Sequence, residues 1–584
     1  MLQIRNKNSI RQRNIWGLDC ENDPDTGAFK LGVIWKNDDD YIVFHDPEKM
    51  AKYLYKPHSV IITGLNIAYD LNLLHPFFRP YRLERVGKLI TCDMARNTAG
   101  KQIKNLKENG HRSRYIEIMD IGNFIQNKSL KQCAKDFGIS HIDIHDWQHP
   151  RIEEACISHA RAGAIILREL QKMFASMGGE IKLTGSSTSL NLFQQKYLQS
   201  EHQIYDNQEE HDLDKIKRST NNAYFGGRTE IFYRGLVRDT TCIDIVSSYP
   251  AVMVNHIYPD MNTAVLIENP GKNFELTRTL EQFEGSIKCT VNHPDTIIPI
   301  LPLKQNGKLI FPSGIFTGTW TFPELRYFLS EGGKILKLHE VVTCKRVHGF
   351  FDKYINAMFE FKQQTDTKPA AKLAMNGLSG KFGQTDANDS FYAEIDDCDI
   401  VDVEKYFEMD GVKYQYQAKD TIFSFNKKAY PLIVAYVTSY ARINLRKQME
   451  NIGYENVLYC DTDSVIYRDI GQKILNAGSN LGQWEIKFTG KWEGRTLKNY
   501  RYKETLKCYW QYVSKGIPGP LQSEFWKHNE VWQMTPVKLK SAIRRNMKLG
   551  KWGIIKKIQG AYQDKRVFDN TGNSTALKLN EVIK

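Results

Sequence analysis

Short runs of apolar and polar residues recur along the chain, and their spacing predicts both strands and helices. In the N-terminal part, strand-like runs at 15–18, 60–62 and 115–118 alternate with helical patterns such as 160–173. Strands that alternate with helices are typical of an α/β domain. The small polar residues at 183–189 predict a linker to the rest of the chain.

The rest of the chain predicts an α+β architecture with inserted regions. Residues 352–383 carry a helical pattern broken at Pro369, and residues 429–450 predict another helix. Residues 491–584 form a basic C-terminal unit. Two apolar runs flank the sequence Tyr459-Cys-Asp-Thr-Asp-Ser464, which predicts a β-hairpin with an acidic pair at its turn.

Length and composition narrow the class of protein. A chain of 584 residues is too long for one core, so we expect two to four domains. The net charge of +13 and the pI of about 9.0 favour polyanionic partners. The ten cysteines form no Cys-x-x-Cys pair, which argues against a zinc or disulfide scaffold. No apolar run is long enough for a signal peptide or a membrane span, so we expect a cytoplasmic protein without membrane contact.

The acidic pair suggests a metal site. Asp461 and Asp463 are two residues apart, so on an extended strand both carboxylates leave the same face. Two such charges in an apolar setting are costly unless a cation lies between them, and Mg²⁺ suits hard oxygen ligands. An isolated Asp-Thr-Asp is otherwise an exposed acidic turn. Upstream, Asp244 ends a strand and supplies the third carboxylate that two-metal phosphoryl transfer requires.

A row of polar residues lies between these acidic segments in the sequence. Lys368, Lys372 and Asn376 follow one another at intervals of four residues, which places them on one face of a helix. Cations that face three carboxylates would hold a triphosphate with its Mg²⁺. The alternative for the lysine row alone is a solvated helix face.

In their order, these segments resemble motifs A, B and C of the family B DNA polymerases, with Asp244 in A, Lys372 to Gly380 in B and the acidic turn in C. The chain also resembles the protein-primed branch found in phages and linear plasmids. Three further segments carry this second resemblance. Tyr224-Phe-Gly226-Gly227 is similar to a Tyr-x-Gly-Gly segment of that branch, and Thr438-Ser-Tyr-Ala441-Arg442 is similar to its Thr-x-x-Ala-Arg template-binding motif. Lys498-Asn-Tyr500 is similar to its Lys-x-Tyr primer motif, for which Lys507-Cys-Tyr509 is a second possible match.

The resemblance implies a fold. We expect an α/β, RNase H-like exonuclease domain followed by an α+β right-hand polymerase with palm, fingers, thumb and two insertion subdomains. The implied boundaries are 1–185 for the exonuclease-like domain and 186–584 for the polymerase, with the palm at 186–255 and 429–490, the insertions at 256–350 and 385–428, the fingers at 352–384 and the thumb at 491–584.

The resemblance also implies roles for residues and partners. Asp244, Asp461 and Asp463 would be catalytic, and Asp244, Ile245 and Asp463 would hold two Mg²⁺ ions, with Mn²⁺ as a substitute. The nucleotide would contact Tyr249, Lys362, Lys368, Lys372 and Asn376. DNA would contact Tyr224, Gly226, Gly227, Thr438, Arg442, Lys498 and Tyr500. The implied partners of a monomer are primer–template DNA, dNTPs and a terminal protein that serves as primer.

Motif B departs from the family pattern Asn-Ser-x-Tyr-Gly. The chain has Asn376-Gly-Leu-Ser379-Gly380, so the aromatic ring that packs against the new base pair is absent. A hydroxymethyl group offers no such stacking surface. We expect weaker base selection or nucleotide affinity.

The N-terminal part resembles a DEDD-type 3′–5′ exonuclease, another two-metal hydrolase. Asp19 and Glu21 share one strand face, and Asp70 adds a third carboxylate. Asn66 and Tyr69 would bind the frayed strand. Residues 151–172 contain no Asp for the third motif, Tyr-x-x-x-Asp. Its two registers place Arg161 or Gly163 at the fourth carboxylate; we favour Gly163, which pairs with His159, and we expect impaired exonuclease activity.

These features predict a template-directed, DNA-dependent DNA polymerase that is replicative, protein-primed and strand-displacing. One alternative is a nucleic-acid-binding protein with a degenerate polymerase fold, to which the two departures point. Another is a reverse transcriptase or RNA polymerase palm, against which the Asp-Thr-Asp spacing and the bulky Tyr249 argue.

Overall fold

The structure is a computed structural model of the whole chain. The residues that it describes are 1–5, 9–23, 26–54, 60–74, 82–86, 89–93, 117–125, 128–144, 146–205, 210–384, 391–394, 406–409, 412–417, 429–536, 553–560 and 565–580. None of the helices in these ranges is both long and apolar enough to cross a membrane.

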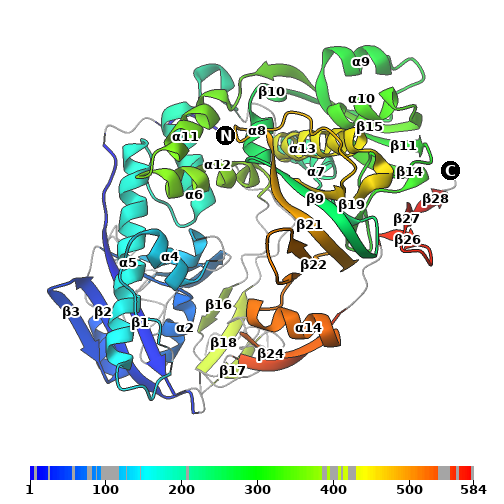
Figure 1. The fold of residues 1–584 in the computed structure, drawn as a ribbon. Helices are drawn as coiled ribbons and strands as arrows, with labels where there is room; N and C mark the ends of the chain where they lie inside the picture. The colour runs from blue at the N-terminus through cyan, green and yellow to red at the C-terminus, as the bar shows by residue number, and fades with distance from the viewer. Residues whose placement is uncertain are drawn as a thin grey trace.

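The N-terminal part is an α/β layer structure, as the sequence predicts (Figure 1). Among the described residues, five strands form one mixed sheet in the order β3-β2-β1-β4-β7, with β4 parallel to both β1 and β7. The long helix α5 packs on one face, while α1 and α2 pack on the other. The bounds are β1 Asn14–Asn22, β2 Phe29–Asn37, β3 Asp40–Phe44, α1 Pro47–Leu54, β4 Val60–Gly64, α2 Ile67–Leu73, β5 Arg82–Val86, β6 Leu89–Asp93, β7 Glu117–Asp120, α4 Leu130–Asp136 and α5 Ile152–Ser176.

Helix α5 lies unusually close to this sheet. A side chain at Gly17 of β1 would place its Cβ only 1.9 Å from the carbonyl oxygen of Ala160. A Cβ at Gly163, one turn further along α5, would lie 3.8 Å from the Cα of Gly64 in β4. Because no side chain separates the two elements at Gly17, residues on this part of α5 come directly over the ends of β1 and β4.

The predicted linker at 183–189 is wrong. Thr184 caps helix α6 (Gly185–Leu192), and its hydroxyl accepts a hydrogen bond of 3.1 Å from the Ser187 amide. The small polar residues therefore mark a helix N-terminus, where Ser and Thr satisfy free amide groups. Leu190 and Phe193 join the same apolar core as Phe174 of α5, so the chain passes from one half to the other without a flexible break.

The second half is built on a large antiparallel sheet. Among the described residues, seven strands follow the order β23-β22-β21-β9-β20-β19-β8. The predicted hairpin is confirmed as β19 and β20, which pair directly. The sheet continues past the implied palm boundary at residue 490, because β21, β22 and β23 extend it. The bounds are α7 Glu210–Asn221, β8 Thr229–Ile231, β9 Gly235–Ile245, α8 Ser248–Met253, α13 Pro431–Ile452, β19 Val457–Asp461, β20 Ser464–Arg468, β21 Trp484–Thr496, β22 Asn499–Glu504 and β23 Gln511–Ser514.

The predicted helical pair is confirmed as α11 (Asp352–Gln363) and α12 (Lys368–Phe382), which pack together. The break lies at 364–367, just before Pro369. Proline occupies the first turn of α12, where its missing N–H costs no helical hydrogen bond.

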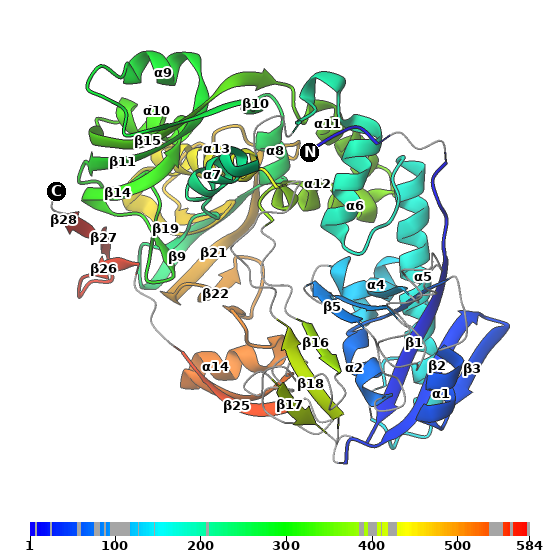
Figure 2. The ribbon, with the colours of Figure 1, turned by 180° about the vertical axis from the view of Figure 1, so that it is seen from behind.

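The region between motifs A and B forms a separate sheet (Figure 2). Its strand order is β10-β15-β11-β14-β28, so the C-terminal strand β28 pairs in parallel with β14 and returns the chain end to this insertion. The bounds are β10 Ile257–Glu268, α9 Leu276–Gln282, β11 Glu284–His293, β12 Leu303–Gln305, β13 Lys308–Ile310, β14 Ser313–Thr321, α10 Phe322–Ser330, β15 Lys334–His348 and β28 Lys578–Asn580.

Two smaller regions complete the structure. Of the implied second insertion, 385–428, the described residues form a three-stranded sheet in the order β16-β18-β17; the remainder lies outside the described residues. In the C-terminal part, the described residues form a short helix and two pairs of antiparallel strands, β24 with β25 and β26 with β27. The bounds are β16 Phe391–Glu394, β17 Tyr406–Met409, β18 Val412–Gln417, α14 Gln522–His528, β24 Glu530–Pro536, β25 Gly553–Gln559, β26 Arg566–Phe568 and β27 Ser574–Ala576.

A buried ionic group joins the C-terminal hairpin to the large sheet. Glu230 of β8 accepts a hydrogen bond of 2.6 Å from the Arg228 Nε, and its other oxygen lies 3.7 Å from Arg566 Nη1. All three side chains are almost fully buried. One carboxylate is thus the countercharge that two almost fully buried guanidinium groups share.

We predict that Glu230→Ala strongly destabilises the chain. The change leaves Arg228 and Arg566 buried side by side without a countercharge, which costs about 3–5 kcal/mol. Urea unfolding should show the loss as a lower midpoint. The control is Glu275→Ala, which removes an exposed pair with Arg278 and should cost about 0–1 kcal/mol. Equal midpoints for the two variants would contradict the assigned role of Glu230.

Candidate active site

Three carboxylates gather at one end of the large sheet. Asp244 lies near the end of β9, where the register places it opposite Ser464 of β20, and Asp461 ends β19 opposite the same serine. Asp463 lies in the turn between β19 and β20, and its carbonyl accepts a hydrogen bond of 2.9 Å from the Ile245 amide. The expectation that Asp461 and Asp463 share one face of an extended strand is therefore wrong, because the turn brings them together instead.

The acidic turn is held in an unusual conformation. Thr462 has a φ of 63°, in the left-handed region, and its amide donates a 2.6 Å hydrogen bond to the Arg228 carbonyl. Its side chain packs on Gly227, where an added Cβ would lie 2.6 Å from the Thr462 methyl group. This close approach gives a physical reason for the glycine at position 227.

Lysines lie beside two of the carboxylates. Lys498 Nζ is 3.0 Å from Asp461 Oδ2, and Lys487 Nζ is 3.6 Å from Asp244 Oδ1. Sequence reasoning missed Lys487, because it belongs to no motif and reaches the site only through the pairing of β21 with β9.

Burial changes the acidity of these carboxylates. It raises the pKa of Asp463 to about 6, with a further contribution from the charges of Asp244 and Asp461. It also raises the pKa of Asp244, although the charge of Lys487 opposes the shift. These groups are therefore costly to ionise without cations nearby.

The donor set fits a hard divalent cation in its chemistry. Asp244, Asp461 and Asp463 offer carboxylate oxygens, which Mg²⁺ prefers. Ile245 has a side chain packed in the core, so only its main-chain oxygen could contribute. The three carboxylates do not have ligand atoms within 4.8 Å of one another; among the residues described, a group that meets this limit occurs only in the N-terminal domain.

The predicted polar row lies along α12. Lys368, Lys372 and Asn376 are exposed on one face of this helix, while Ser379 lies on the buried face. Lys362 of α11 donates a hydrogen bond of 3.0 Å to the Ser247 hydroxyl beside motif A. Burial and then the charges of Lys372 and Lys368 lower the pKa of Lys362, so the three lysines form one cationic cluster.

Tyr249 lies near the acidic turn. It is half-buried in the first turn of α8. Burial raises its pKa; the charge of Arg442 opposes the shift, while Tyr224, Asp463 and Asp461 add to it. The Tyr249 hydroxyl thus lies close enough to Asp461 and Asp463 for their charges to raise its pKa.

Thr438 and Arg442 are not placed for direct contact with DNA, contrary to expectation. Each side chain is 4% exposed. Arg442 donates hydrogen bonds to the carbonyls of Phe225 (2.7 Å) and Gly226 (2.8 Å) and to Glu324 (2.7 Å). Thr438 donates one of 3.1 Å to the Ala435 carbonyl. Arg442 therefore holds the Tyr224–Gly227 segment in place, and Gly226 itself remains exposed.

The structure separates the two placements of the Lys-x-Tyr segment. Lys498, in the turn between β21 and β22, contacts Asp461, and the Tyr500 ring lies 5.1 Å from that of Tyr459. In the rival placement, Lys507 pairs instead with Glu504 and Tyr509 is 57% exposed. Lys498 and Tyr500 are thus the pair beside the acidic turn.

A second acidic group lies in the N-terminal domain. Asp19 and Glu21 project from β1, and Asp70 of α2 accepts a hydrogen bond of 2.7 Å from the Cys20 amide. Burial raises the pKa of Asp70 well above its usual value and, with the charge of Asp19, that of Glu21 to about 8.

The predicted strand-binding residues lie beside this group. Asn66 has a φ of 56°, and its amide donates a hydrogen bond of 3.3 Å to Asp120. The Tyr69 hydroxyl hydrogen-bonds to Asn22. These hydrogen bonds join Tyr69 to the end of β1 and Asn66 to the end of β7. Neither bond involves the carboxylate of Asp19 or Glu21.

Neither expected register of the third exonuclease motif supplies a carboxylate to the acidic group. Arg161 turns away and bonds to Asp38 at 2.6 Å. A Cβ at Gly163 would meet only Gly64 within 4 Å. Two residues of α5 contact Asp19: His159, whose Nδ1 lies 3.3 Å from Asp19 Oδ2, and Cys156, whose Sγ lies 3.4 Å from the Asp19 carbonyl oxygen. Burial lowers the pKa of this imidazole, but the hydrogen bond to Asp19, the charges of Asp19 and Glu21 and the hydrogen bond to Ile142 together outweigh burial, and the net pKa shift is upward.

Comparison with known proteins identifies the family. The profile of the family described as DNA polymerase type B, organellar and viral, matches residues 161–477, more than half of the chain. The chain belongs to this family of type B DNA polymerases.

Two curated relatives belong to the same class. The "DNA-directed DNA polymerase" of Enterobacteria phage PRD1 is 24% identical over 57% of this chain and 57% of its own length. The "Probable DNA polymerase" of Agaricus bitorquis is 26% identical over 49% of this chain. The match spans about half of the length of these relatives, 57% and 39%.

Solved structures confirm the right-hand polymerase fold with an exonuclease-like domain. Phi29 DNA polymerase, in a ternary complex with primer–template DNA and incoming nucleotides, covers 94% of this chain and 100% of its own with a TM-score of 0.72 and 14% identity. The same polymerase with single-stranded DNA gives a TM-score of 0.70 and 15% identity.

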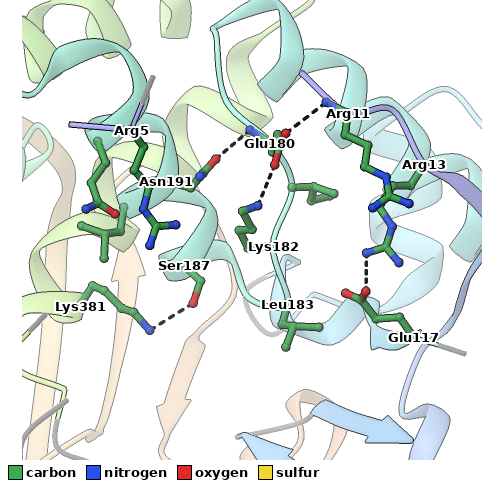
Figure 3. Close-up of a pocket in the computed structure, with 13 residues that line it drawn as sticks. Arg5, Arg11, Arg13, Glu117, Glu180, Lys182, Leu183, Ser187, Asn191 and Lys381 are labelled. Carbon is green, nitrogen blue, oxygen red and sulfur yellow. Dashed lines mark hydrogen bonds and ion pairs between the residues drawn. The ribbon is translucent and has the colours of Figure 1, made fainter. Parts of the chain in front are cut away.

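This type B polymerase also has a basic cavity where its two halves meet (Figure 3). The cavity has a volume of about 510 Å³. Glu180 pairs with Lys182 at 2.8 Å, and Glu117 pairs with Arg13. Cations outnumber carboxylates among the charged lining residues, which are Arg5, Arg11, Arg13, Lys182, Lys381, Glu117 and Glu180. Sequence reasoning missed this site, because its arginines precede the first strand and reach it only through long-range contacts.

We predict that Asp463→Asn stabilises the metal-free chain at pH 8. The pKa of Asp463 is about 6 in the folded chain against 3.8 ordinarily, so the folded chain binds this proton more tightly and loses stability as the pH rises through that range. The advantage of the variant should therefore shrink below pH 6 and vanish near pH 4. Urea unfolding in EDTA at pH 4, 6 and 8 measures it.

The control for the change in net charge is Asp366→Asn, in the exposed turn before α12. A stability difference between wild type and Asp463→Asn that stays constant from pH 4 to pH 8 would contradict the raised pKa of Asp463.

Proposed function

We propose that this chain is a template-directed, DNA-dependent DNA polymerase that adds dNTPs to a 3′ end by two-metal-ion phosphoryl transfer. The observation that carries the proposal is the gathering of Asp244, Asp461 and Asp463 at one sheet end, close to the cationic cluster of α11 and α12. Membership of the type B polymerases and the printed names of the relatives support it.

Each residue has a role that follows from its position. Asp244, Asp463 and the main-chain oxygen of Ile245 would hold two Mg²⁺ ions, or Mn²⁺ in their place. Such ions activate the attacking hydroxyl and neutralise charge on the phosphates. Asp461 adds negative charge beside them, held by Lys498 and by the hydroxyl of Thr229 at 2.9 Å.

The nucleotide is held by charge and shape. Lys362, Lys368 and Lys372 neutralise the triphosphate, and Asn376 lies on the same exposed face of α12. The Tyr249 ring would pack on the sugar and exclude a 2′-hydroxyl, a role that its position at the start of α8 near the acidic turn supports. Ser379 is buried, so it offers the base pair no stacking surface, and we propose weakened nucleotide affinity.

DNA is the proposed macromolecular partner. Tyr224, Gly226 and Gly227 form a surface segment beside the acidic turn, and Lys498 with Tyr500 lies across that turn. The phi29 structures named above contain primer–template or single-stranded DNA. A net charge of +13 and the basic cavity between the halves also suit a polyanion.

Finer features of the proposal rest on the resemblance to the protein-primed branch. We propose a replicative, strand-displacing monomer that acts in the cytoplasm of a host and starts from a terminal protein. The relative from phage PRD1 supports this setting. Synthesis on a primed single-stranded circle, with and without a strand to displace, tests the displacement activity.

We predict that Asp244→Ala and Asp463→Ala each lower nucleotide addition by several orders of magnitude, because each removes a metal ligand. Binding of a primer–template duplex should remain. The matched control is Asp239→Ala, which changes an exposed aspartate on the same strand β9. Extension at the wild-type rate by either site variant would refute the assignment.

We predict that Tyr249→Val admits ribonucleotides, because a smaller side chain removes the clash with the 2′-hydroxyl. The dNTP/rNTP ratio of kcat/KM should fall about tenfold or more. The control is Tyr509→Val, at an exposed position.

The same assay separates the alternative functions. On DNA and RNA templates with both nucleotide types, a degenerate binding protein would extend no primer. A reverse transcriptase or RNA polymerase would use RNA templates or rNTPs efficiently without any substitution.

We predict slow or absent digestion of a single-stranded 3′ end with Mg²⁺, while a matched primer is extended. Since His159 faces Asp19, His159→Asp should raise digestion, and Asp19→Ala should remove that gain. Arg161→Asp is the control, because it adds a carboxylate to the same helix where Arg161 faces Asp38. Rapid digestion by the unmodified chain would contradict the predicted impairment.

A further inference from the structure

The acidic group of the N-terminal domain contains an imidazole. Asp19 and Glu21 of β1 and His159 of α5 each offer one ligand atom, and these atoms all lie within 4.8 Å of one another. Among the residues described, no other group of three His, Cys, Asp or Glu side chains meets this limit. The group therefore needs an explanation of its own.

This donor set does not fit the two-Mg²⁺ cage of four carboxylates that the family resemblance implies. Asp70 Oδ1 is occupied by the Cys20 amide, and Asp70 is not among the converging donors. Imidazole nitrogen is a poor ligand for Mg²⁺ but suits Zn²⁺, Co²⁺ and other first-row transition ions. The disagreement thus points to a different cation.

The spacing of the donors matches a single small ion. His159 Nδ1 lies 3.3 Å from Asp19 Oδ2 and 3.9 Å from Glu21 Oε1. Donors bound at about 2.0–2.1 Å to a tetrahedral ion lie about 3.3–3.4 Å apart. The first distance has this value, the second is somewhat longer, and the Asp19 and Glu21 oxygens lie within 4.8 Å of each other.

The imidazole is already oriented by a partner outside the group. His159 Nε2 lies 3.0 Å from the carbonyl oxygen of Ile142, which can only accept, so Nε2 carries a proton and Nδ1 faces the carboxylates. The Ile142 amide in turn donates a 2.9 Å hydrogen bond to the hydroxyl of Ser158. Residue 142 is thus fixed to α5 at both its polar atoms, an arrangement typical of the support behind a metal-binding histidine.

We infer that Asp19, Glu21 and His159 bind one transition-metal ion, with Zn²⁺ and Co²⁺ preferred over Mn²⁺ and all three over Mg²⁺. Water would complete the coordination, because Asp19 and Glu21 keep 19% and 16% of their side-chain surface exposed. The ion would join β1 to α5 and so stabilise the N-terminal domain. This inference rests on the donor set and is independent of the proposed polymerase activity.

The test uses the full chain after removal of metal by EDTA and dialysis. Zinc chloride is titrated into the protein in a calorimeter, and the zinc content is then measured after dialysis. Both measurements should give one bound zinc ion per chain in wild type and in Asp244→Ala, and none in His159→Ala at the same zinc concentration. His159→Ala should weaken this site at least about tenfold, whereas His45→Ala, at an exposed position, should not. Zinc chloride should raise the melting temperature of wild type more than magnesium chloride does.

Further measurements test whether His159 is a metal ligand and whether its variant is folded. Cobalt chloride should give visible absorption bands that depend on His159, and primer extension by His159→Ala shows whether that variant is folded. In His159→Asp, the Zn²⁺ preference over Mg²⁺ should fall. A zinc stoichiometry unchanged by His159→Ala, or lost entirely in Asp244→Ala, would overturn the inference without bearing on the polymerase proposal.

Discussion

Repulsion between the carboxylates of Asp244, Asp461 and Asp463 is the constraint on which the rest of the structure depends. Burial of Asp463, together with the charges of Asp244 and Asp461, raises the pKa of Asp463. The fold must therefore hold together three carboxylates that repel one another. The turn cannot open, because Thr462 is bonded to the Arg228 carbonyl and packed on Gly227.

That restraint extends to distant parts of the chain. Arg228 is fixed by Glu230, which also binds Arg566 of the C-terminal hairpin. From the same hairpin, Lys565 donates a hydrogen bond of 3.0 Å to the carbonyl of Thr229, whose hydroxyl holds Asp461. The last strands of the chain therefore support a turn that lies about a hundred residues earlier in the sequence.

Local patterns predicted the elements that local forces determine. The β19–β20 hairpin and the α11–α12 pair follow from the spacing of apolar residues and from Pro369. Features set by distant contacts were missed or misread. The sequence predicts Arg442 as a DNA-binding cation, but its side chain is buried against Glu324. Lys487 lies at the site only because β21 pairs with β9.

The same reasoning explains the errors around residue 184 and in α5. Serines and threonines at 183–189 have the composition of a linker, and only the packing of α6 on α12 shows that they begin a helix. The sequence shows that α5 lacks the fourth carboxylate, but the choice of register depends on how closely α5 approaches β1. Gly17 sets that distance and turns His159 toward Asp19.

The shared core shows why an altered exonuclease site need not remove its domain. Phe174 of α5 packs in the same apolar core as Phe193, Tyr354 of α11 and Met375 of α12. Helices α11 and α12 carry the lysines that we propose bind the triphosphate. Loss of α5 would therefore expose apolar surface beneath the proposed nucleotide-binding face, whereas exchange of one polar residue at position 159 leaves that core intact. The packing of α5 against the polymerase helices thus gives the domain a structural role that is independent of the proposed metal site.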